Sequence, residues 1–202
     1  MELIIISSPL PVAQEAEAIN ELFDAGMGVF HLRKPDWSYE QTAKLLTNIN
    51  SKYHHQIALH HHHDLSDEFE IKRLHFTELK RKNTSKIHLA NLKKMGFITS
   101  TSAHQISDLT DLVPFHYKFY GPVFDSISKK GYLSKVGKNF NLASHLINTK
   151  VIALGGIELS NLSIVTSMGF DGIAVLGTIW QKHGNDRITT FQKLQTACYD
   201  QS

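Results

Sequence analysis

The chain has 202 residues, of which 42% are hydrophobic and 20% charged, a composition that allows one domain with a sizeable core and excludes a disordered chain. The formal net charge of +2 gives no reason to expect a nucleic-acid partner. The single cysteine, Cys198, excludes an internal disulfide, as is usual in a reducing compartment.

Short apolar runs alternate with helical patterns along the chain. The first run, 3-LIII-6, has no basic segment before it and is expected to be a buried strand rather than a signal peptide. No apolar run is long enough to span a bilayer. We therefore expect a cytoplasmic protein that acts on a small molecule, with neither membrane nor nucleic acid as a partner. The oligomeric state stays open, a homodimer included.

Eight runs predict strands: 3–6, 29–33, 56–60, 72–77, 97–103, 116–124, 150–156 and 171–177. Helical spacing follows the first, second, fifth, seventh and eighth of them, whereas the basic stretch 80–94 is expected to be irregular. Strands that alternate with helices imply a parallel sheet. Eight of them favour a single-domain (β/α)8 TIM barrel over residues 1–202. Some helices must be abbreviated, because this fold usually takes about 250 residues. An open doubly wound sheet is the alternative.

The last two predicted strands run into glycines, in 153-ALGGI-157 and 172-GIAVLG-177. Glycine lets backbone N–H groups approach an anion, and a following helix N-terminus favours negative charge. The loops after strands seven and eight of a barrel commonly bind phosphate. We therefore predict a phosphate site at Gly155, Gly156, Leu176 and Gly177. The alternative is ordinary turn glycines.

The segment 121-GPVFDSISKK-130 follows the sixth predicted strand. Ser126 and Ser128 offer hydroxyl donors, and Lys129 offers a charge suited to phosphate oxygens. These three residues are candidates for a second phosphate contact. A solvated basic loop is the alternative.

Two further positions carry candidate chemistry. In 29-VFHLRK-34, period-two alternation places His31 and Arg33 on the same face of the strand. An inward Arg33 needs either a substrate anion or an internal carboxylate. His104, just after the fifth strand, is a candidate general acid–base near neutral pH.

These pieces in this order resemble the thiamin phosphate synthase/TenI superfamily of (β/α)8 barrels. The segments that carry the resemblance are 31-HLRK-34, 102-SAH-104, 121-GPVFDSISK-129, 153-ALGGI-157 and 172-GIAVLGTI-179. It covers nearly the whole chain and is weakest over 78–94. It implies a thiamin-biosynthesis enzyme with one of two reactions. The synthase joins a pyrimidine diphosphate to a thiazole phosphate with Mg²⁺, and the TenI-type tautomerase aromatises a thiazole carboxylate phosphate without a cofactor.

The family's site residues carry over only in part. The strand-two pattern Q-x-R-x-K keeps Arg33, but His31 stands at the Gln position and Pro35 at the Lys position. The two carboxylates that the synthase uses for Mg²⁺ correspond to His61 and Lys80. The hydroxyl–lysine loop and the glycine turns match, and His104 corresponds to the acid–base histidine of TenI-type enzymes. The resemblance therefore favours the tautomerase, with the synthase and a non-catalytic phosphate-binding protein as alternatives.

The run 60-HHHH-63 stands where the third strand is expected to end. On an extended strand only alternate side chains share a face. We expect no metal ligand here. The favoured interpretation is a polar strand end, the next a contact of His60 and His61 with a substrate anion. A fortuitous transition-metal site is the third, because imidazoles suit zinc, nickel or copper better than magnesium.

Overall fold

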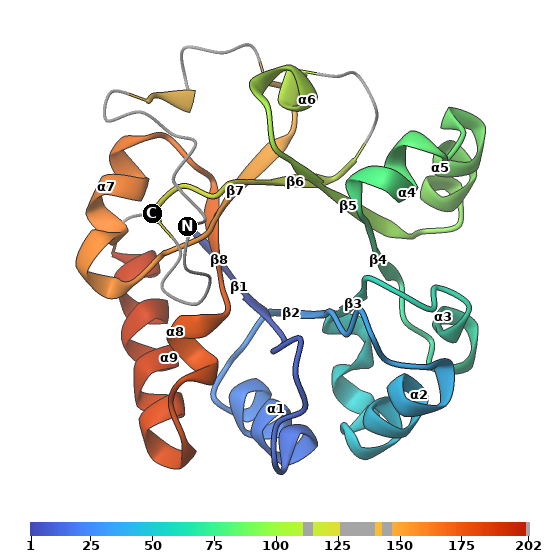
Figure 1. The fold of residues 1–202 in the computed structure, drawn as a ribbon, viewed down its shortest axis with the longest axis horizontal. Coiled ribbons are helices and arrows are strands. Elements are labelled where there is room, and N and C mark those ends of the chain that lie inside the picture. Colours follow the sequence, from blue (N-terminus) through green and yellow to red (C-terminus); the bar gives the residue numbers. More distant parts are fainter. Residues whose placement is uncertain (111–114, 126–139, 143–146, 201–202) are drawn as a thin grey trace.

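The computed structural model describes residues 1–110, 115–125, 140–142 and 147–200, and they build a closed parallel barrel (Figure 1). The sheet runs in chain order from β1 to β8. It closes because β1 (Glu2–Ile6) pairs with both β2 (Val29–Leu32) and β8 (Gly172–Val175). The predicted TIM barrel is confirmed, and the open doubly wound sheet is excluded.

The other strands and the helices alternate around this closed sheet. The strands are β3 (Ile57–Leu59), β4 (Arg73–Phe76), β5 (Ile98–Ala103), β6 (Tyr117–Tyr120) and β7 (Lys150–Leu154). The helices are α1 (Glu15–Asp24), α2 (Tyr39–Asn48), α3 (Leu65–Glu68), α4 (Glu78–Lys82), α5 (Lys86–Lys94), α6 (Ile106–Thr110), α7 (Leu162–Ser167), α8 (Gly177–Trp180) and α9 (Gly184–Tyr199), with 3₁₀ turns at Ser51–Gln56 and Leu159–Asn161. Within the described part of the chain, no helix combines the length and hydropathy needed to cross a bilayer.

Three predicted strands end at least two residues earlier than the apolar runs suggest. The seventh stops at Leu154 instead of residue 156. The sixth stops at Tyr120 instead of residue 124, because Pro122 has no backbone N–H to donate to a ladder. The eighth stops at Val175 because Gly177 begins α8. The three corrections move the predicted glycine and Gly-Pro segments out of the sheet and into the loops above it.

The prediction of an irregular stretch over 80–94 is wrong, since α4 and α5 occupy most of it (Figure 1). Both helices begin at a hydroxyl cap. The Thr77 side chain accepts a hydrogen bond from the backbone N–H of Lys80, and the Ser85 side chain accepts one from that of His88. Leu89 and Leu92 are buried against the barrel.

Period-two alternation along the strands divides the apolar residues into two cores. Phe30, Leu32 and Leu59 face the helices and belong to the larger core. The barrel interior is filled by a smaller cluster, made of Ile4, Ile6, Val29, Tyr117, Phe119, Ile152 and Ala174. Toward the C-terminal ends of the strands the interior also holds polar side chains, among them His31, His75 and Ser100.

Candidate active site

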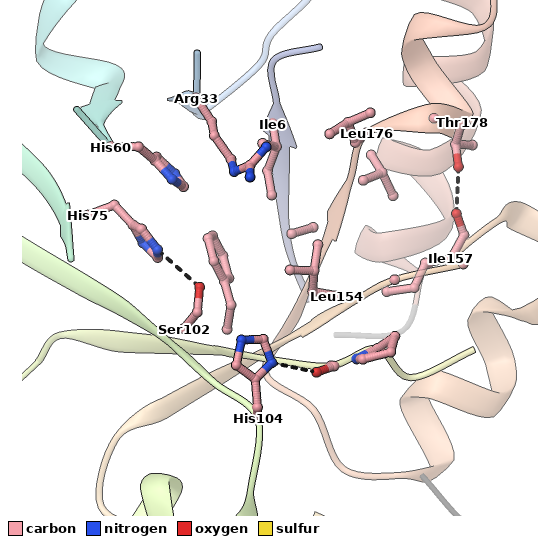
Figure 2. Close-up of a pocket in the computed structure, with 18 of the residues that line it drawn as sticks. Ile6, Arg33, His60, His75, Ser102, His104, Leu154, Ile157, Leu176 and Thr178 are labelled. Atoms are coloured by element: carbon pink, nitrogen blue, oxygen red, sulfur yellow. Dashed lines mark hydrogen bonds between the residues drawn. The ribbon is translucent and has the colours of Figure 1, made fainter. Parts of the chain in front are cut away.

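A cavity of about 390 Å³ opens at the C-terminal ends of the strands (Figure 2). Figure 2 shows Arg33, His60 and His75 on one side, Leu176 and Thr178 on the other, and His104 below them. The lining residues are Ile6, Arg33, His60, His75, Thr77, Ser102, His104, Phe119, Gly121, Pro122, Leu154, Gly155, Gly156, Ile157, Ala174, Val175, Leu176, Gly177, Thr178 and Gln181.

The cavity brings together most of the residues predicted for the site. Its walls contain Arg33, His60, His104 and the four predicted phosphate-site positions Gly155, Gly156, Leu176 and Gly177. His31 is fully buried inside the barrel, and His61 is half-buried beside the cavity without lining it. Ser126, Ser128 and Lys129 lie outside the described residues.

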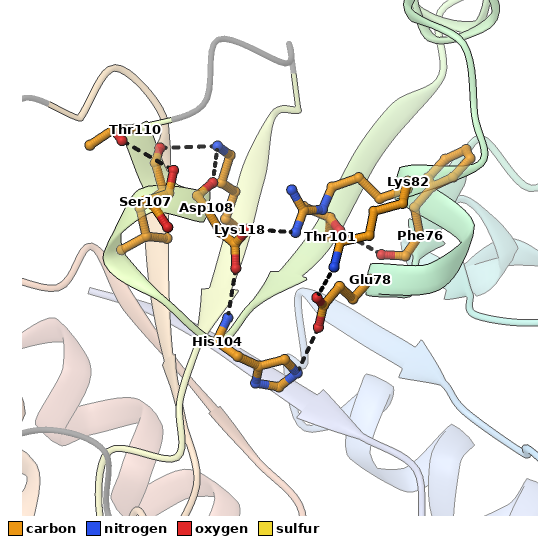
Figure 3. Close-up of polar contacts among 11 residues, drawn as sticks. Phe76, Glu78, Lys82, Thr101, His104, Ser107, Asp108, Thr110 and Lys118 are labelled. Carbon is orange, nitrogen blue, oxygen red and sulfur yellow. Dashed lines mark hydrogen bonds and ion pairs between the residues drawn. The ribbon is translucent and has the colours of Figure 1, made fainter.

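His104 follows the last residue of β5 and is held from two sides, by Asp108 (Figure 3) and by Gly121 (Figure 2). Its backbone N–H donates to Asp108 Oδ2 over 3.4 Å, which joins the residue to α6. Its Nδ1 lies 3.2 Å from the Gly121 carbonyl oxygen. A carbonyl can only accept, so Nδ1 carries the hydrogen and the lone pair of the neutral ring lies on Nε2.

Glu78, in the first turn of α4, faces Nε2 of His104. Its Oε2 lies 4.0 Å from Nε2, and its Oε1 accepts from Lys82 Nζ at 2.6 Å (Figure 3). The hydrogen bond and the charge of Lys82 lower the pKa of the Glu78 carboxyl, and the nearby His104 adds to that shift. The carboxylate is therefore ionised where it can stabilise an imidazolium.

Arg33 reaches the cavity from just beyond β2. Its backbone is fixed by Ser7, whose Oγ accepts from the Arg33 N–H at 2.8 Å. The sequence left open that Arg33 pairs with an internal carboxylate. Among the described residues, no carboxylate lies within ion-pair distance of its guanidinium. Lys34 points the other way, and its Nζ lies 2.7 Å from Glu15 Oε2.

Only the first member of the histidine run enters the cavity. The backbone N–H of His60 bonds to Leu32 O over 3.2 Å, so the alternation of β3 continues and turns this ring inward. His62 adopts a left-handed φ of 49° and its Nε2 lies 2.8 Å from Trp37 O, on the outside. Burial, and then the charge of Arg33, lowers the pKa of His61. The side chains of the run were expected to alternate between the two faces of a strand. They do not do so beyond His60, because the strand ends at Leu59.

His60 is part of a polar cluster in the barrel interior. Its Nε2 lies 2.9 Å from Nδ1 of His31, whose Nε2 lies 2.6 Å from the Tyr117 hydroxyl. His75 stacks on His60 with ring centroids 3.9 Å apart. Burial lowers the pKa of His31 to about 3 and holds those of His60 and His75 well below the usual range. The three rings are therefore neutral at physiological pH.

Sequence reasoning missed five lining residues with polar side chains, namely His75, Thr77, Ser102, Thr178 and Gln181. A usable signal exists for His75. It alternates with Leu74 and Phe76, which belong to the larger core, so its own side chain must face the barrel interior.

The glycine end of the cavity is a turn in which both glycines have a positive φ. Gly155 and Gly156 take φ values of 102° and 64°. The hydroxyl of Thr178 donates to Ile157 O over 2.6 Å, which ties α8 to this turn. Ile179 and Trp180 donate their N–H groups to Leu176 O, whereas those of Gly177 and Thr178 have no acceptor within the helix. They therefore remain as donors beside the two glycines.

Comparisons with known proteins agree with this architecture. The family model described as Thiamine monophosphate synthase matches residues 3–179. A protein of Lysinibacillus sphaericus named thiamine-phosphate synthase is 27% identical over 179 residues, covering 84% of this chain and 82% of its own. One of the same name from Leuconostoc citreum is 23% identical, covering 84% of each chain.

Solved structures give the same result. The crystal structure of thiamine phosphate pyrophosphorylase from Bacteroides thetaiotaomicron superposes with a TM-score of 0.75 at 27% identity, covering 97% of this chain and 96% of that one. The Pyrococcus furiosus protein of that name reaches 0.77 at 15% identity, with 99% and 96% covered, which shows the fold alone. Since the family model spans nearly the whole barrel, the chain belongs to the thiamine monophosphate synthase family, within the thiamin phosphate synthase/TenI superfamily of thiamin-biosynthesis enzymes.

Proposed function

We propose that the chain is a TenI-type thiazole tautomerase, which aromatises a thiazole carboxylate phosphate by moving one proton. The observation that carries this proposal is His104, a wall residue of the cavity whose Nδ1 is anchored to Gly121 O and whose Nε2 faces Glu78. An oriented imidazole beside a carboxylate is the arrangement that general acid–base catalysis needs.

The proton is expected to pass through Nε2 of His104. This nitrogen takes a proton from one position of the substrate and returns it at another, so that the atoms of substrate and product balance. The imidazolium formed in between is stabilised by the Glu78 carboxylate and by the Gly121 carbonyl, which accepts from Nδ1–H. His104 would thus act as both base and acid.

The two ends of the cavity are suited to the two anionic groups of such a substrate. The phosphate is placed against Gly155, Gly156 and Gly177, where backbone N–H groups and the start of α8 favour an anion. The carboxylate is placed against Arg33, whose planar guanidinium forms two parallel bonds with a carboxylate. His60 is placed beside the same end of the ligand.

The family implies Mg²⁺ for the synthase reaction, and the residues of this cavity do not fit that ion. Magnesium prefers oxygen ligands, carboxylates above all. None of the described lining residues is an Asp or a Glu. The position of one family carboxylate holds His61. The other holds Lys80, whose ammonium lies 5.8 Å from the Phe76 ring centroid. No step is therefore assigned to magnesium.

The synthase reaction is the second candidate, and the names of the relatives favour it. The Lysinibacillus sphaericus and Leuconostoc citreum proteins are both called thiamine-phosphate synthase. In that reaction the chain would join the pyrimidine diphosphate to the thiazole phosphate and release pyrophosphate. The cations Arg33 and Lys80 would then have to offset the charge of the diphosphate.

The deciding experiment is proton NMR of the non-aromatic thiazole carboxylate phosphate mixed with the protein in EDTA. We expect conversion to the aromatic isomer. His104→Ala should slow it by about 100-fold or more, the usual contribution of general acid–base catalysis. The affinity for the product should stay within a few-fold, because the phosphate end is untouched. The exposed His88 on α5 gives the matched control, and His88→Ala should convert at the wild-type rate.

A second reaction tube, run beside the EDTA tube of the NMR experiment, distinguishes the remaining functions. It contains the thiazole phosphate, the pyrimidine diphosphate and Mg²⁺. Formation of thiamin phosphate there, with no conversion in the first tube, would replace the tautomerase by the synthase. Ligand binding without conversion in either tube would leave a phosphate-binding protein. Full activity of His104→Ala would refute the assigned acid–base.

A further inference from the structure

Three buried histidines converge on the floor of the cavity from neighbouring strands. His31 comes from β2, His60 follows β3 and His75 comes from β4, and Figure 2 shows the last two facing the cavity. They are 0%, 4% and 1% exposed. One ring nitrogen of each lies within 4.8 Å of those of the other two. The nitrogens that face one another are His31 Nδ1 and His60 Nε2, 2.9 Å apart, and His75 Nε2, which also lies 3.1 Å from Ser102 Oγ.

The chemical state of the three rings suits metal binding. Burial lowers their pKa values, so each ring is neutral and offers a nitrogen lone pair without first releasing a second proton. Two rings are also held from behind. His31 Nε2 lies 2.6 Å from the Tyr117 hydroxyl, and His75 Nδ1 lies 2.9 Å from Ser100 Oγ. Metal-binding histidines usually have such an outer hydrogen bond, which fixes the ring.

The spacing requires a small adjustment of the rings. In a tetrahedral site with bonds of 2.0–2.1 Å, the ligand nitrogens are about 3.3 Å apart. The separations here reach no more than 4.8 Å, and the stack of His60 on His75 has to open. Side-chain rotations that shorten the longest nitrogen–nitrogen separation by roughly 1.5 Å would allow all three nitrogens to bond to one ion.

We propose that His31, His60 and His75 bind one transition-metal dication of the Zn²⁺ type, with its open coordination position facing the cavity. Three imidazoles and one exchangeable position form the ligand set of catalytic rather than structural zinc sites. The preference for nitrogen ligands separates this site from the magnesium that the family implies. The proposal does not depend on which reaction the chain catalyses.

The test is titration calorimetry of the full chain, freed of metal with EDTA and then exchanged into chelator-free buffer. We expect ZnCl₂ to bind at one ion per chain and MgCl₂ to give no saturable signal at the same concentrations. His75→Gln should weaken zinc binding by at least 100-fold. Tyr117→Phe, which removes only the hydroxyl behind His31, should weaken it about 10- to 100-fold, as the loss of an outer partner does.

The histidine run itself is the main competing site, so it supplies the control. His62 belongs to the run but points outward to Trp37, whereas His75 lies outside the run. Zinc affinity that is unchanged in His62→Asn and lost in His75→Gln supports the proposal. Loss in His62→Asn with retention in His75→Gln places the metal on the outer surface and overturns it. Absence of saturable zinc binding by the wild-type chain overturns it as well.

Thermal unfolding guards against a variant that fails to fold. Bound zinc should raise the melting temperature of the wild-type chain but not that of His75→Gln. If His75→Gln does not fold, Tyr117→Phe decides, because it retains all three imidazoles. Wild-type zinc affinity in a folded Tyr117→Phe variant would then contradict the site.

Discussion

Gly156 shows how much of the phosphate end depends on a missing side chain. A Cβ at this position would lie 2.6 Å from Asp125 O and 2.8 Å from Phe124 Cβ, and the φ of 64° is left-handed. We expect Gly156→Ala to lower the free energy of unfolding by about 1–3 kcal/mol, from the strain of that backbone region. It should also weaken binding of the substrate phosphate. Urea unfolding and a phosphate-ligand titration measure the two effects.

Gly28 is the matched control for this change. A Cβ added there meets no atom within 4 Å. Gly28→Ala should therefore leave both the free energy of unfolding and the ligand affinity nearly unchanged. A Gly156→Ala variant as stable and as tight-binding as Gly28→Ala would contradict the role given to this turn.

The sequence predicted which residues lie near the cavity better than it predicted how deeply they are buried and what they contact. His104, Arg33 and the glycines lie where strand ends and turn chemistry place them. His31 was predicted as a ligand contact, yet it lies beneath the cavity, because alternation gives the face of a side chain and not its depth in the barrel. His75 was not among the predicted site residues, although its strand has the same alternation. His62 points outward because its own backbone is left-handed, and no pattern of apolar residues predicts such a backbone.

At the scale of elements, one buried ion pair ties α1 to the segment after β2. Lys34 Nζ and Glu15 Oε2 lie 2.7 Å apart, with side chains 1% and 4% exposed. Burial raises the pKa of Glu15 and lowers that of Lys34, in both cases against the attraction of the partner. The cost of removing two charges from water therefore outweighs their pairing. Loss of one partner leaves the other charge buried alone.

We expect Glu15→Leu to lower the free energy of unfolding by about 3 kcal/mol or more, the usual cost of an uncompensated buried charge. The double variant Glu15→Leu/Lys34→Met should regain most of that loss. An exposed ion pair, Lys150 with Glu2, gives the comparison. Its charged atoms lie 3.6 Å apart, and the two side chains are 65% and 31% exposed. Lys150→Gln should change the free energy of unfolding by less than 1 kcal/mol. Urea unfolding of the four proteins measures these differences.

Whether an element could be predicted from the sequence depended on how many apolar residues it contains. The strands and the long helices follow from runs and spacing of apolar residues. Helices α4 and α5 are rich in lysine and present few apolar residues to the barrel, so periodicity alone predicted an irregular stretch. Their hydroxyl caps, Thr77 and Ser85, were the available signal. Short polar helices in a barrel are thus better sought from their caps.

At the scale of the whole molecule, the buried imidazoles should make stability depend on pH. The pKa of His31 is lowered to about 3, and those of His60 and His75 lie well below 6.5, whereas in the unfolded chain all three are near 6.5. Below pH 6.5 the unfolded chain therefore binds protons that the folded chain does not. The free energy of unfolding should fall as pH falls from 6.5 toward 3, and should not depend on these groups above 6.5.

The expected slope is about 1.4 kcal/mol per pH unit for each histidine, or roughly 4 kcal/mol for the three. Urea unfolding at pH 7.5, 6.0 and 5.0 in the presence of EDTA measures it. His63, whose pKa burial lowers to about 4, adds its own share to the measured slope. His75→Gln should reduce the slope by about 1.4 kcal/mol per pH unit, and the exposed His55 gives the control, since His55→Gln should keep it. A free energy of unfolding that is constant between pH 6.5 and 5.0 would show that the cluster is protonated in the fold.

The count of strands and their alternation with helices were enough to predict the barrel. The closure between β1 and β8 rests on register pairs such as Glu2 with Gly172, which no local pattern contains.

That closure has a consequence for synthesis. The first strand leaves the ribosome early and must wait for about 170 residues of translation before its second neighbour exists. During that interval its edge and the apolar rows beside it are exposed to other nascent chains. The growing sheet can add strands one by one from β2 onward, but it stays open-ended until residue 175 is free. The barrel can therefore close only after β8 has been synthesised, whichever strands have paired before it.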